Sequence, residues 1–111
     1  MKILVCGGRE YKDWEKIYSI LDKEKPTEII EGGARGADTI AREWAKSRKV
    51  PYKTYKANWD KYKKAAGPIR NQEMIDKEHP DKVLAFPDPN SRGTYDMIDK
   101  SNKKNIPTEI F

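Results

Sequence analysis

Short apolar runs alternate with segments of helical periodicity along the whole chain. Residues 2–6 and 82–86 are almost continuous apolar runs, which is typical of strands buried on both faces of a parallel sheet. The runs at 51–56 and 106–111 mix in polar residues or Pro107, which suits strands at the edges of a sheet. We expect strands at residues 2–6, 27–31, 51–56, 82–86 and 106–111.

Amphipathic segments separate these strands. Asp13 is placed to cap the first segment, whose apolar residues include Ile17 and Leu21 at helical spacing. Pro68 is placed to open the third helix, and residues 57–68 are predicted to be irregular. We expect helices after Asp13 and before Pro26, after Gly36, from Pro68 onward, and after the polar turn at residues 87–93.

The order of these elements predicts the topology. Strands that alternate with helices require right-handed crossovers and a parallel sheet covered by helices on both faces. The two most apolar strands, 2–6 and 82–86, belong at the centre of that sheet. The expected strand order is therefore 3-2-1-4-5, with its reversal point between the first and fourth strands. We expect residues 1–111 to form a single three-layer α/β domain of the Rossmann type.

The composition limits the kinds of ligand and the kinds of site that we expect. The net charge of +5 favours anionic partners such as nucleotides or nucleic acid, although the lysines are spread over every segment. Cys6 is the single cysteine and His79 the single histidine, so a disulfide framework, a multi-cysteine metal site and a histidine-based triad all lack partners. We expect Cys6 to pack in the core, His79 to cap a helix or lie on the surface, and the protein to need neither a metal nor a cofactor.

No apolar stretch approaches the roughly 20 residues of a membrane-spanning helix. The run at residues 3–6 is too short for a signal peptide. We therefore expect a cytoplasmic protein without a membrane partner.

Four loops that are rich in glycine and arginine lie at one edge of the expected sheet, at residues 7–9, 32–38, 66–71 and 88–94. Ligands of such folds bind beyond the carboxyl ends of the strands, near the reversal point. Glycine allows a close approach of the backbone, helix N-termini offer free N–H groups to anions, and arginine matches phosphate geometry. The candidate ligand-binding residues are Gly7, Gly8, Arg9, Gly32, Gly33, Ala34, Arg35, Gly36, Asp38, Arg70, Asn71, Arg92, Gly93 and Thr94.

Each of these residue types also has a purely structural interpretation. The glycines could serve only to form tight turns, and Asp38 and Asp96 could serve only as acidic residues in the first turn of a helix. If they act on a ligand, Asp38, Asn71 or Asp96 would contact its sugar or base. Trp59 and Tyr62 could stack on a base, close a subunit interface or simply pack.

The motifs resemble those of the SLOG superfamily, specifically its small YspA-like branch. They are Gly7-Gly8-Arg9 with Tyr11 and Asp13, Gly-Gly-Ala-Arg-Gly-Ala-Asp at 32–38, Trp44-Ala45, Ala-Gly-Pro-Ile-Arg-Asn at 66–71, Ala85-Phe86-Pro87 and Gly93-Thr94. The resemblance covers nearly the whole chain. It implies a Rossmann-like fold and a nucleotide-related ligand, which such a protein would sense or sequester.

A second function class follows from the similarity to the Lonely Guy phosphoribohydrolases, which cleave the base from nucleoside monophosphates. Gly93-Thr94 and Arg70 are similar to parts of their motifs. The Pro-Gly-Gly of that motif is missing, and Met97 occupies the position of its glutamate, where a thioether cannot act as acid or base. The candidate catalytic residues for hydrolysis are Asp96, Asp38 and Arg70, with one aspartate stabilising an oxocarbenium-like transition state.

A third class follows from the similarity of the loop at 32–38 to the Rossmann domain of DprA proteins, which bind single-stranded DNA. The basic balance and the tyrosine–lysine stretch at 52–64 are compatible with it, although such binding usually needs a continuous groove with stacking aromatics. Nucleotide binding is the leading prediction. The resemblance and the aromatic residues also suggest a homo-oligomer.

Overall fold

The computed structural model describes residues 1–111 and contains one five-stranded parallel sheet. Its strand order, β3-β2-β1-β4-β5, confirms the predicted 3-2-1-4-5 arrangement. The strands are β1 (Lys2–Gly7), β2 (Glu28–Glu31), β3 (Tyr52–Thr54), β4 (Lys82–Phe86) and β5 (Thr108–Ile110). The helices are α1 (Trp14–Glu24), α2 (Ala37–Ser47), α3 (Trp59–Tyr62), α4 (Ala66–Glu78) and α5 (Arg92–Lys103), with a 3₁₀ turn at Lys63–Ala65.

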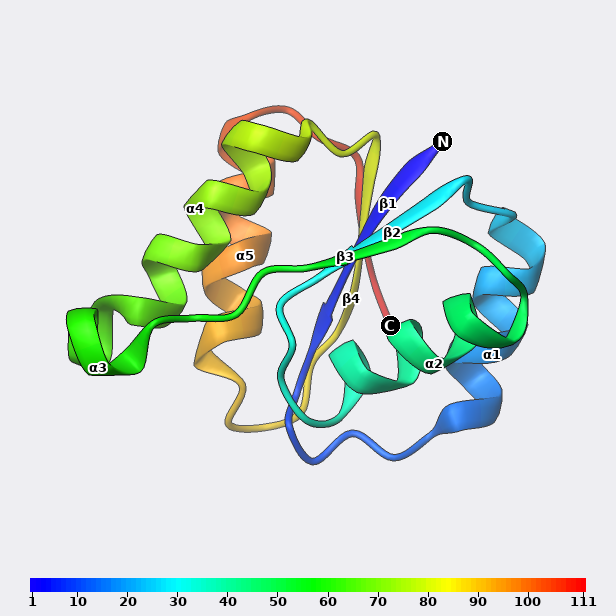
Figure 1. Ribbon diagram of the computed structural model, residues 1–111, viewed down its shortest axis with the longest axis horizontal. Coiled ribbons are helices and arrows are strands. Elements are labelled where there is room, and N and C mark those ends of the chain that lie inside the picture. The colour runs from blue at the N-terminus through cyan, green and yellow to red at the C-terminus, as the bar shows by residue number, and fades with distance from the viewer.

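The helices cover the two faces of the sheet in pairs. Helices α1 and α2 lie on one face and α4 and α5 on the other (Figure 1). Alternate residues of β1 serve the two sides: Ile3 and Val5 belong to the core cluster with α1 and α2, whereas Leu4 and Cys6 belong to the cluster with α4 and α5. This two-sided burial explains why the central strands are nearly continuous apolar runs.

Several local predictions are confirmed. Asp13 caps α1, its Oδ1 accepting a hydrogen bond from the amide of Lys16 at 3.1 Å. His79 follows α4 in the left-handed conformation with φ of 47° and is exposed. Cys6 is buried in the core, and this burial raises the pKa of its thiol.

The protein contains no helix with the length and apolar character needed to cross a membrane.

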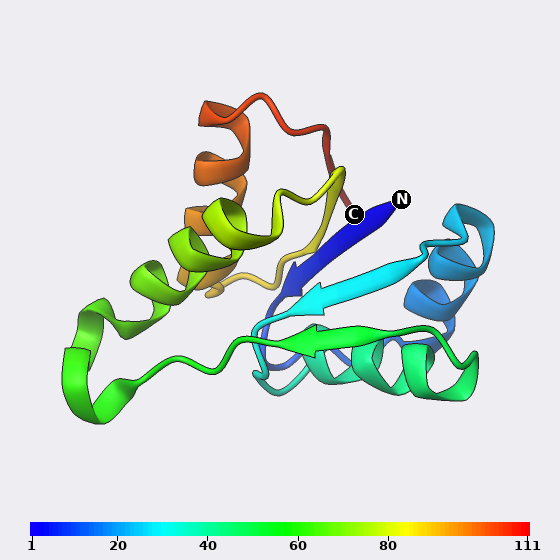
Figure 2. The same cartoon turned by 45° about the horizontal axis from the view of Figure 1, so that its top comes forward.

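The prediction for residues 57–68 is wrong. This stretch holds α3 and a 3₁₀ turn, and α4 begins at Ala66 rather than at Pro68. Pro68 occupies the third position of α4, where a missing N–H costs no hydrogen bond because the first turn has no intrahelical acceptors. The short helix α3 extends beyond the sheet, at the start of α4 (Figure 2).

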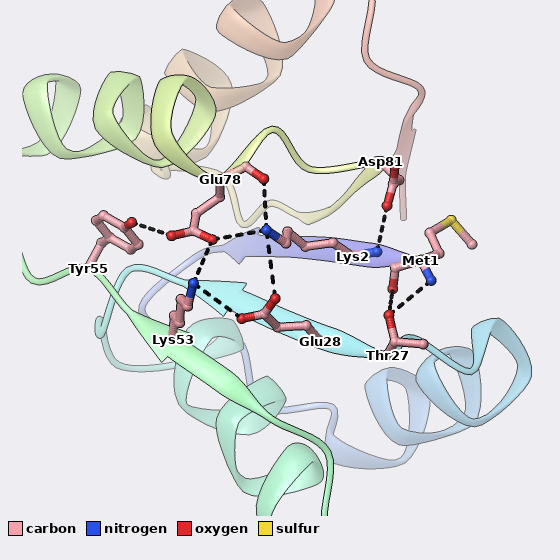
Figure 3. Close-up of polar contacts among 8 residues, drawn as sticks. All are labelled: Met1, Lys2, Thr27, Glu28, Lys53, Tyr55, Glu78 and Asp81. Atoms are coloured by element: carbon pink, nitrogen blue, oxygen red, sulfur yellow. Dashed lines mark hydrogen bonds and ion pairs between the residues drawn. The ribbon is translucent and has the colours of Figure 1, made fainter.

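A network of buried and half-buried charges fastens the end of α4 to the strands. The Glu78 carboxylate accepts hydrogen bonds from Lys2, Lys53 and the Tyr55 hydroxyl, and both lysines lie 3.7 Å from Glu28 (Figure 3). Burial opposes ionisation of Glu78, but these three donors outweigh it and lower its pKa. The network therefore fixes Tyr55, the residue from which the chain departs toward α3.

Candidate functional site

A cleft of about 460 Å³ lies at the carboxyl edge of the sheet, beyond β1, β2 and β3. The loop after β1, the loop after β2, the segment after β3 and helix α4 all contribute to its walls. The cleft is lined by Arg9, Gly32, Gly33, Ala34, Arg35, Lys56, Ala57, Trp59 and Arg70. Four of these nine side chains are cationic, and none carries a carboxylate.

Three cleft-lining residues follow β3: Lys56 and Ala57 lie between β3 and α3, and Trp59 is the first residue of α3. The sequence predicts a stacking role as one of the possibilities for Trp59, whereas the candidate ligand-binding residues do not include Lys56 and Ala57. The signal that could have found them is the position of this segment directly after a strand of the same sheet. The sequence predicts an edge strand as far as Lys56 and an irregular connection from Ala57, and neither pattern indicates that these two residues face a cleft.

Two buried carboxylates hold the floor of the cleft. Asp38 Oδ2 accepts hydrogen bonds from the amides of Gly32 at 3.0 Å and Ala34 at 3.4 Å. Glu31 Oε1 accepts from the amide of Gly33 at 2.6 Å. These three consecutive amides are thus occupied by the protein itself, so the loop presents small side chains to a ligand rather than free N–H groups.

Arg70 joins the two sides of the cleft. Its Nη1 donates to the carbonyl oxygens of Gly32 at 2.6 Å and Tyr55 at 3.4 Å, and its Nε donates to Asn71 Oδ1 at 3.0 Å. No protein group accepts a hydrogen bond from its Nη2. One side of the guanidinium therefore fixes the loops, and the other remains free for a ligand.

The charges beneath the cleft influence each other strongly. Burial raises the pKa of Asp38 to about 7, although the Arg70 guanidinium opposes this rise. Burial also raises the pKa of Glu31, opposed by hydrogen bonds from Thr54 and Gly33. Burial also lowers the pKa of Arg70, and the negative charge of Asp38 opposes this decrease. The floor of the cleft therefore combines the Arg70 guanidinium with two carboxyl groups, those of Asp38 and Glu31, whose pKa values are raised.

The cations at the rim are held loosely. Arg35 Nη2 lies 3.1 Å from Glu10 Oε1, and both side chains are about three-quarters exposed. Exposed pairs of this kind contribute little to stability, so an anionic ligand can replace Glu10 at small cost. Arg9 is also exposed, and its guanidinium lies over the ring of Trp59.

The glycines beside the cleft allow its loops to pack against each other. Gly36 has a φ of +76°, and a Cβ there would lie 2.0 Å from the Gly8 carbonyl oxygen. A Cβ on Gly8 would lie 1.8 Å from Asp88 Oδ2, and one on Gly7 would lie 2.4 Å from the Cβ of Ala37. The structure explains these three glycines by loop packing alone, so their contact with a ligand stays a prediction.

The remaining candidates lie between α4 and α5, outside the lining of the cleft. Asn71 Nδ2 donates to the Gly93 carbonyl at 3.1 Å and to Asp96 Oδ2 at 3.0 Å, and Lys100 Nζ lies 2.6 Å from Asp96 Oδ1. Thr94 is buried. Arg92 begins α5, is exposed and makes no side-chain hydrogen bond or ion pair.

Met97 is completely buried in the core cluster beneath α4 and α5. The position that holds the glutamate in the Lonely Guy motif therefore points into the apolar interior in this protein. Packing requires an apolar side chain there.

Comparison with known proteins identifies the family. A model of the YspA, cpYpsA-related SLOG family matches residues 1–62. Gene 61 protein of Mycobacterium phage D29 is 34% identical over 120 residues, which cover 99% of this chain and 95% of that protein. DNA processing protein A (DprA) from Streptococcus pneumoniae has a similar fold, with a TM-score of 0.55 and 17% identity, over 97% of this chain.

The chain spans only 58% of that DprA chain, and the likeness concerns the fold. The family match covers the loops after β1 and β2 and the segment that leads to Trp59. Together with the phage relative, it confirms the resemblance that the glycine and arginine motifs indicated. The chain therefore belongs to the YspA, cpYpsA-related SLOG family.

Proposed function

We propose that this protein binds a nucleotide or a nucleotide-derived ligand in the cleft, and thereby senses or sequesters it. The observation that carries the proposal is the convergence of Arg9, Arg35, Lys56 and Arg70 on one cleft. The volume of about 460 Å³ is within the usual range for small-molecule sites. Membership of the SLOG family, whose ligands are nucleotide-related, supports the same hypothesis.

Phosphate groups would bind at the cationic side chains. Arg35 can exchange its exposed contact with Glu10 for a charge-assisted hydrogen bond to phosphate. Arg70 can add its free Nη2 from the floor. The amides of Gly32, Gly33 and Ala34 already have carboxylate partners, so the proposal assigns the anion to side chains rather than to this loop.

The geometry supports binding more than hydrolysis of the N-glycosidic bond. An oxocarbenium-like transition state needs a carboxylate in contact with the sugar. Asp38 accepts two backbone hydrogen bonds beneath the floor, and Asp96 is paired with Asn71 and Lys100 outside the cleft. Neither lines the cleft.

The test is to incubate the pure protein with a mixed nucleotide pool and to identify retained and released molecules by mass spectrometry. Retention of one unchanged species supports binding. Accumulation of free base and ribose phosphate would establish hydrolysis instead. Binding only to single-stranded DNA, with an affinity that falls steeply with salt, would favour the nucleic-acid function.

Variants then locate the site. We expect Arg35→Ala to weaken binding of the retained nucleotide about tenfold, since a charge-assisted hydrogen bond is lost. Arg48→Ala is the matched control, because Arg48 is likewise an exposed arginine paired with a carboxylate, that of Asp22. The proposal fails if Arg35→Ala and Arg70→Ala bind every nucleotide as tightly as the original protein.

A further inference from the structure

Trp59 forms an aromatic wall of the cleft. Its side chain is 47% exposed, whereas Trp44, which packs in the core, is 2% exposed. An indole has a large apolar surface whose burial is favourable, so leaving it half exposed forgoes stabilisation. Because Trp59 lines the cleft, a ligand that covers the ring there would recover that stabilisation.

Two other elements of the fold contact this ring. The Arg9 guanidinium, from the loop after β1, lies 5.6 Å from the ring centroid. On α4, a Cβ at Gly67 would lie 3.5 Å from Trp59 Cη2, so the edge of the indole approaches the first turn of that helix closely. Trp59 thus keeps contacts with the rest of the fold although α3 extends away from the sheet (Figures 1 and 2).

The side chains around the indole leave room for a flat group. Gly33, Ala34 and Ala57 line the same cleft and carry at most one carbon atom in their side chains. The guanidinium of Arg9 is itself a planar cation, and guanidinium groups stack on aromatic faces as nucleobases do. The cleft therefore offers two planar groups, one from the loop after β1 and one from α3, with small residues beside them.

We propose that the nucleobase of the bound ligand stacks on Trp59, displacing the exposed Arg9 guanidinium from the indole, and that Arg9 then covers the opposite face of the base. The inference rests on the proposed function and assigns the base, where that function assigned the phosphate. It also assigns different roles to Trp59 and Tyr62. Tyr62 is similarly exposed and belongs to the same short helix, but it does not line the cleft.

Calorimetric titrations with AMP, GMP and ribose 5-phosphate test the stacking. Ribose 5-phosphate retains the sugar and the phosphate but lacks the base. We expect the original protein to bind one or both nucleotides at least about tenfold more tightly than ribose 5-phosphate. Trp59→Ala should remove this preference while leaving the affinity for ribose 5-phosphate within about twofold, and Trp59→Phe should retain part of it.

Tyr62→Ala is the matched control and should preserve the preference. Arg9→Lys, which keeps the charge but not the planar group, should lower affinity for the nucleotide more than for ribose 5-phosphate. Circular dichroism confirms that each variant is folded. In the original protein, quenching of indole fluorescence by AMP or GMP, with no quenching by ribose 5-phosphate, gives a second readout that Trp59→Phe should diminish.

The outcomes distinguish this inference from the function on which it rests. Equal affinity of the original protein for the nucleotides and ribose 5-phosphate would overturn the stacking and leave phosphate binding intact. An equal loss of both in Trp59→Ala would overturn it too, because the tryptophan would then only maintain the cleft. If none of the three compounds binds, both proposals fall.

Discussion

The carboxyl edge of the sheet has two sides, and their polar side chains differ in whether they are paired within the protein. On the side of β1, β2 and β3, Arg9, Arg35 and Lys56 line an open cleft and are exposed. Between α4 and α5, by contrast, Asn71, Asp96 and Lys100 bind one another. The first set of polar groups is exposed, and Arg35 and Arg9 in it make only the exposed contacts with Glu10 and Trp59, whereas the second set is satisfied within the chain.

This difference separates residues that serve the fold from residues that can serve a ligand. A partly buried polar group that already has its hydrogen bonds loses them when it turns toward a ligand. A cation at the rim of a cleft loses only a weak contact with water or an exposed carboxylate. Arg70 belongs to both categories, since one side of its guanidinium holds the loops and the other is free.

Removing Arg70 should produce the largest effect. Arg70→Ala leaves the Gly32 carbonyl oxygen and Asn71 Oδ1 without the donor that each has now, and it removes the cation near Asp38 and Glu31. We expect the free energy of unfolding to fall by about 3 kcal/mol, as measured by urea denaturation. Nucleotide binding should be lost as well.

Arg70→Lys serves as the companion variant, because it keeps a positive charge without the planar fork. We expect its free energy of unfolding to lie between those of the original protein and Arg70→Ala. If Arg70→Ala were as stable as the original protein, Arg70 would not hold the loops, and the comparison between the two sides would lose its connecting residue.

The pH dependence of stability should reveal Asp38. In the folded protein its pKa is about 7, against an ordinary value of 3.8. Between these values the folded state binds one more proton than the unfolded state, so the free energy of unfolding falls as the pH rises. The slope from this one group is about 1.4 kcal/mol per pH unit and vanishes above the folded pKa.

Asp38→Asn removes this titration and keeps an oxygen that can accept from the amides of Gly32 and Ala34. We therefore expect the stability of the original protein relative to Asp38→Asn to fall by about 2 kcal/mol between pH 5 and pH 7. Urea denaturation of both proteins at pH 5, 6, 7 and 8 measures it. A difference that stays constant, or that grows with pH, would contradict the raised pKa.

The fold was predictable because its signals are local and consistent. The apolar runs at 2–6 and 82–86 required two covered faces, and the alternation of strands and helices left few topologies. The short helix α3 escaped prediction because four residues are too few to show a helical period. Its N-cap, Asn58, accepts a hydrogen bond from the amide of Lys61, but such a signal is weak without an apolar stripe.

The site was predictable only in part, because sequence gives the location of a residue and not its partners. Arg35 and Arg92 have the same chemistry and both follow a strand of the same sheet. Their difference arises from packing: one lines the cleft, and the other begins α5 outside it. Likewise, no pattern in the chain indicated that Asp38 and Glu31 would occupy the amides of the loop between them.

Asp96 should affect stability moderately and nucleotide binding little. Asp96→Asn removes the ion pair with Lys100, whose side chain is 18% exposed, and we expect a loss of about 1 kcal/mol in urea denaturation. Asp99→Asn is the matched control, since Asp99 pairs with Lys103 at the same spacing but on the exposed face of α5. We expect Asp99→Asn to lower the free energy of unfolding by less than Asp96→Asn does. A loss of turnover in Asp96→Asn, in a protein shown to hydrolyse nucleotides, would place Asp96 in the reaction and overturn the division between the two sides.

Arg92 should have the smallest effect of all. Its side chain is exposed and has no protein partner, so Arg92→Ala should change stability by less than about 0.5 kcal/mol. Because it does not line the cleft, its loss should also change nucleotide affinity less than twofold, whereas Arg35→Ala should weaken it about tenfold. Parallel titrations of the two variants measure this ratio. If both lose affinity equally, the ligand extends across the whole carboxyl edge, and the loop at the start of α5 belongs to the site after all.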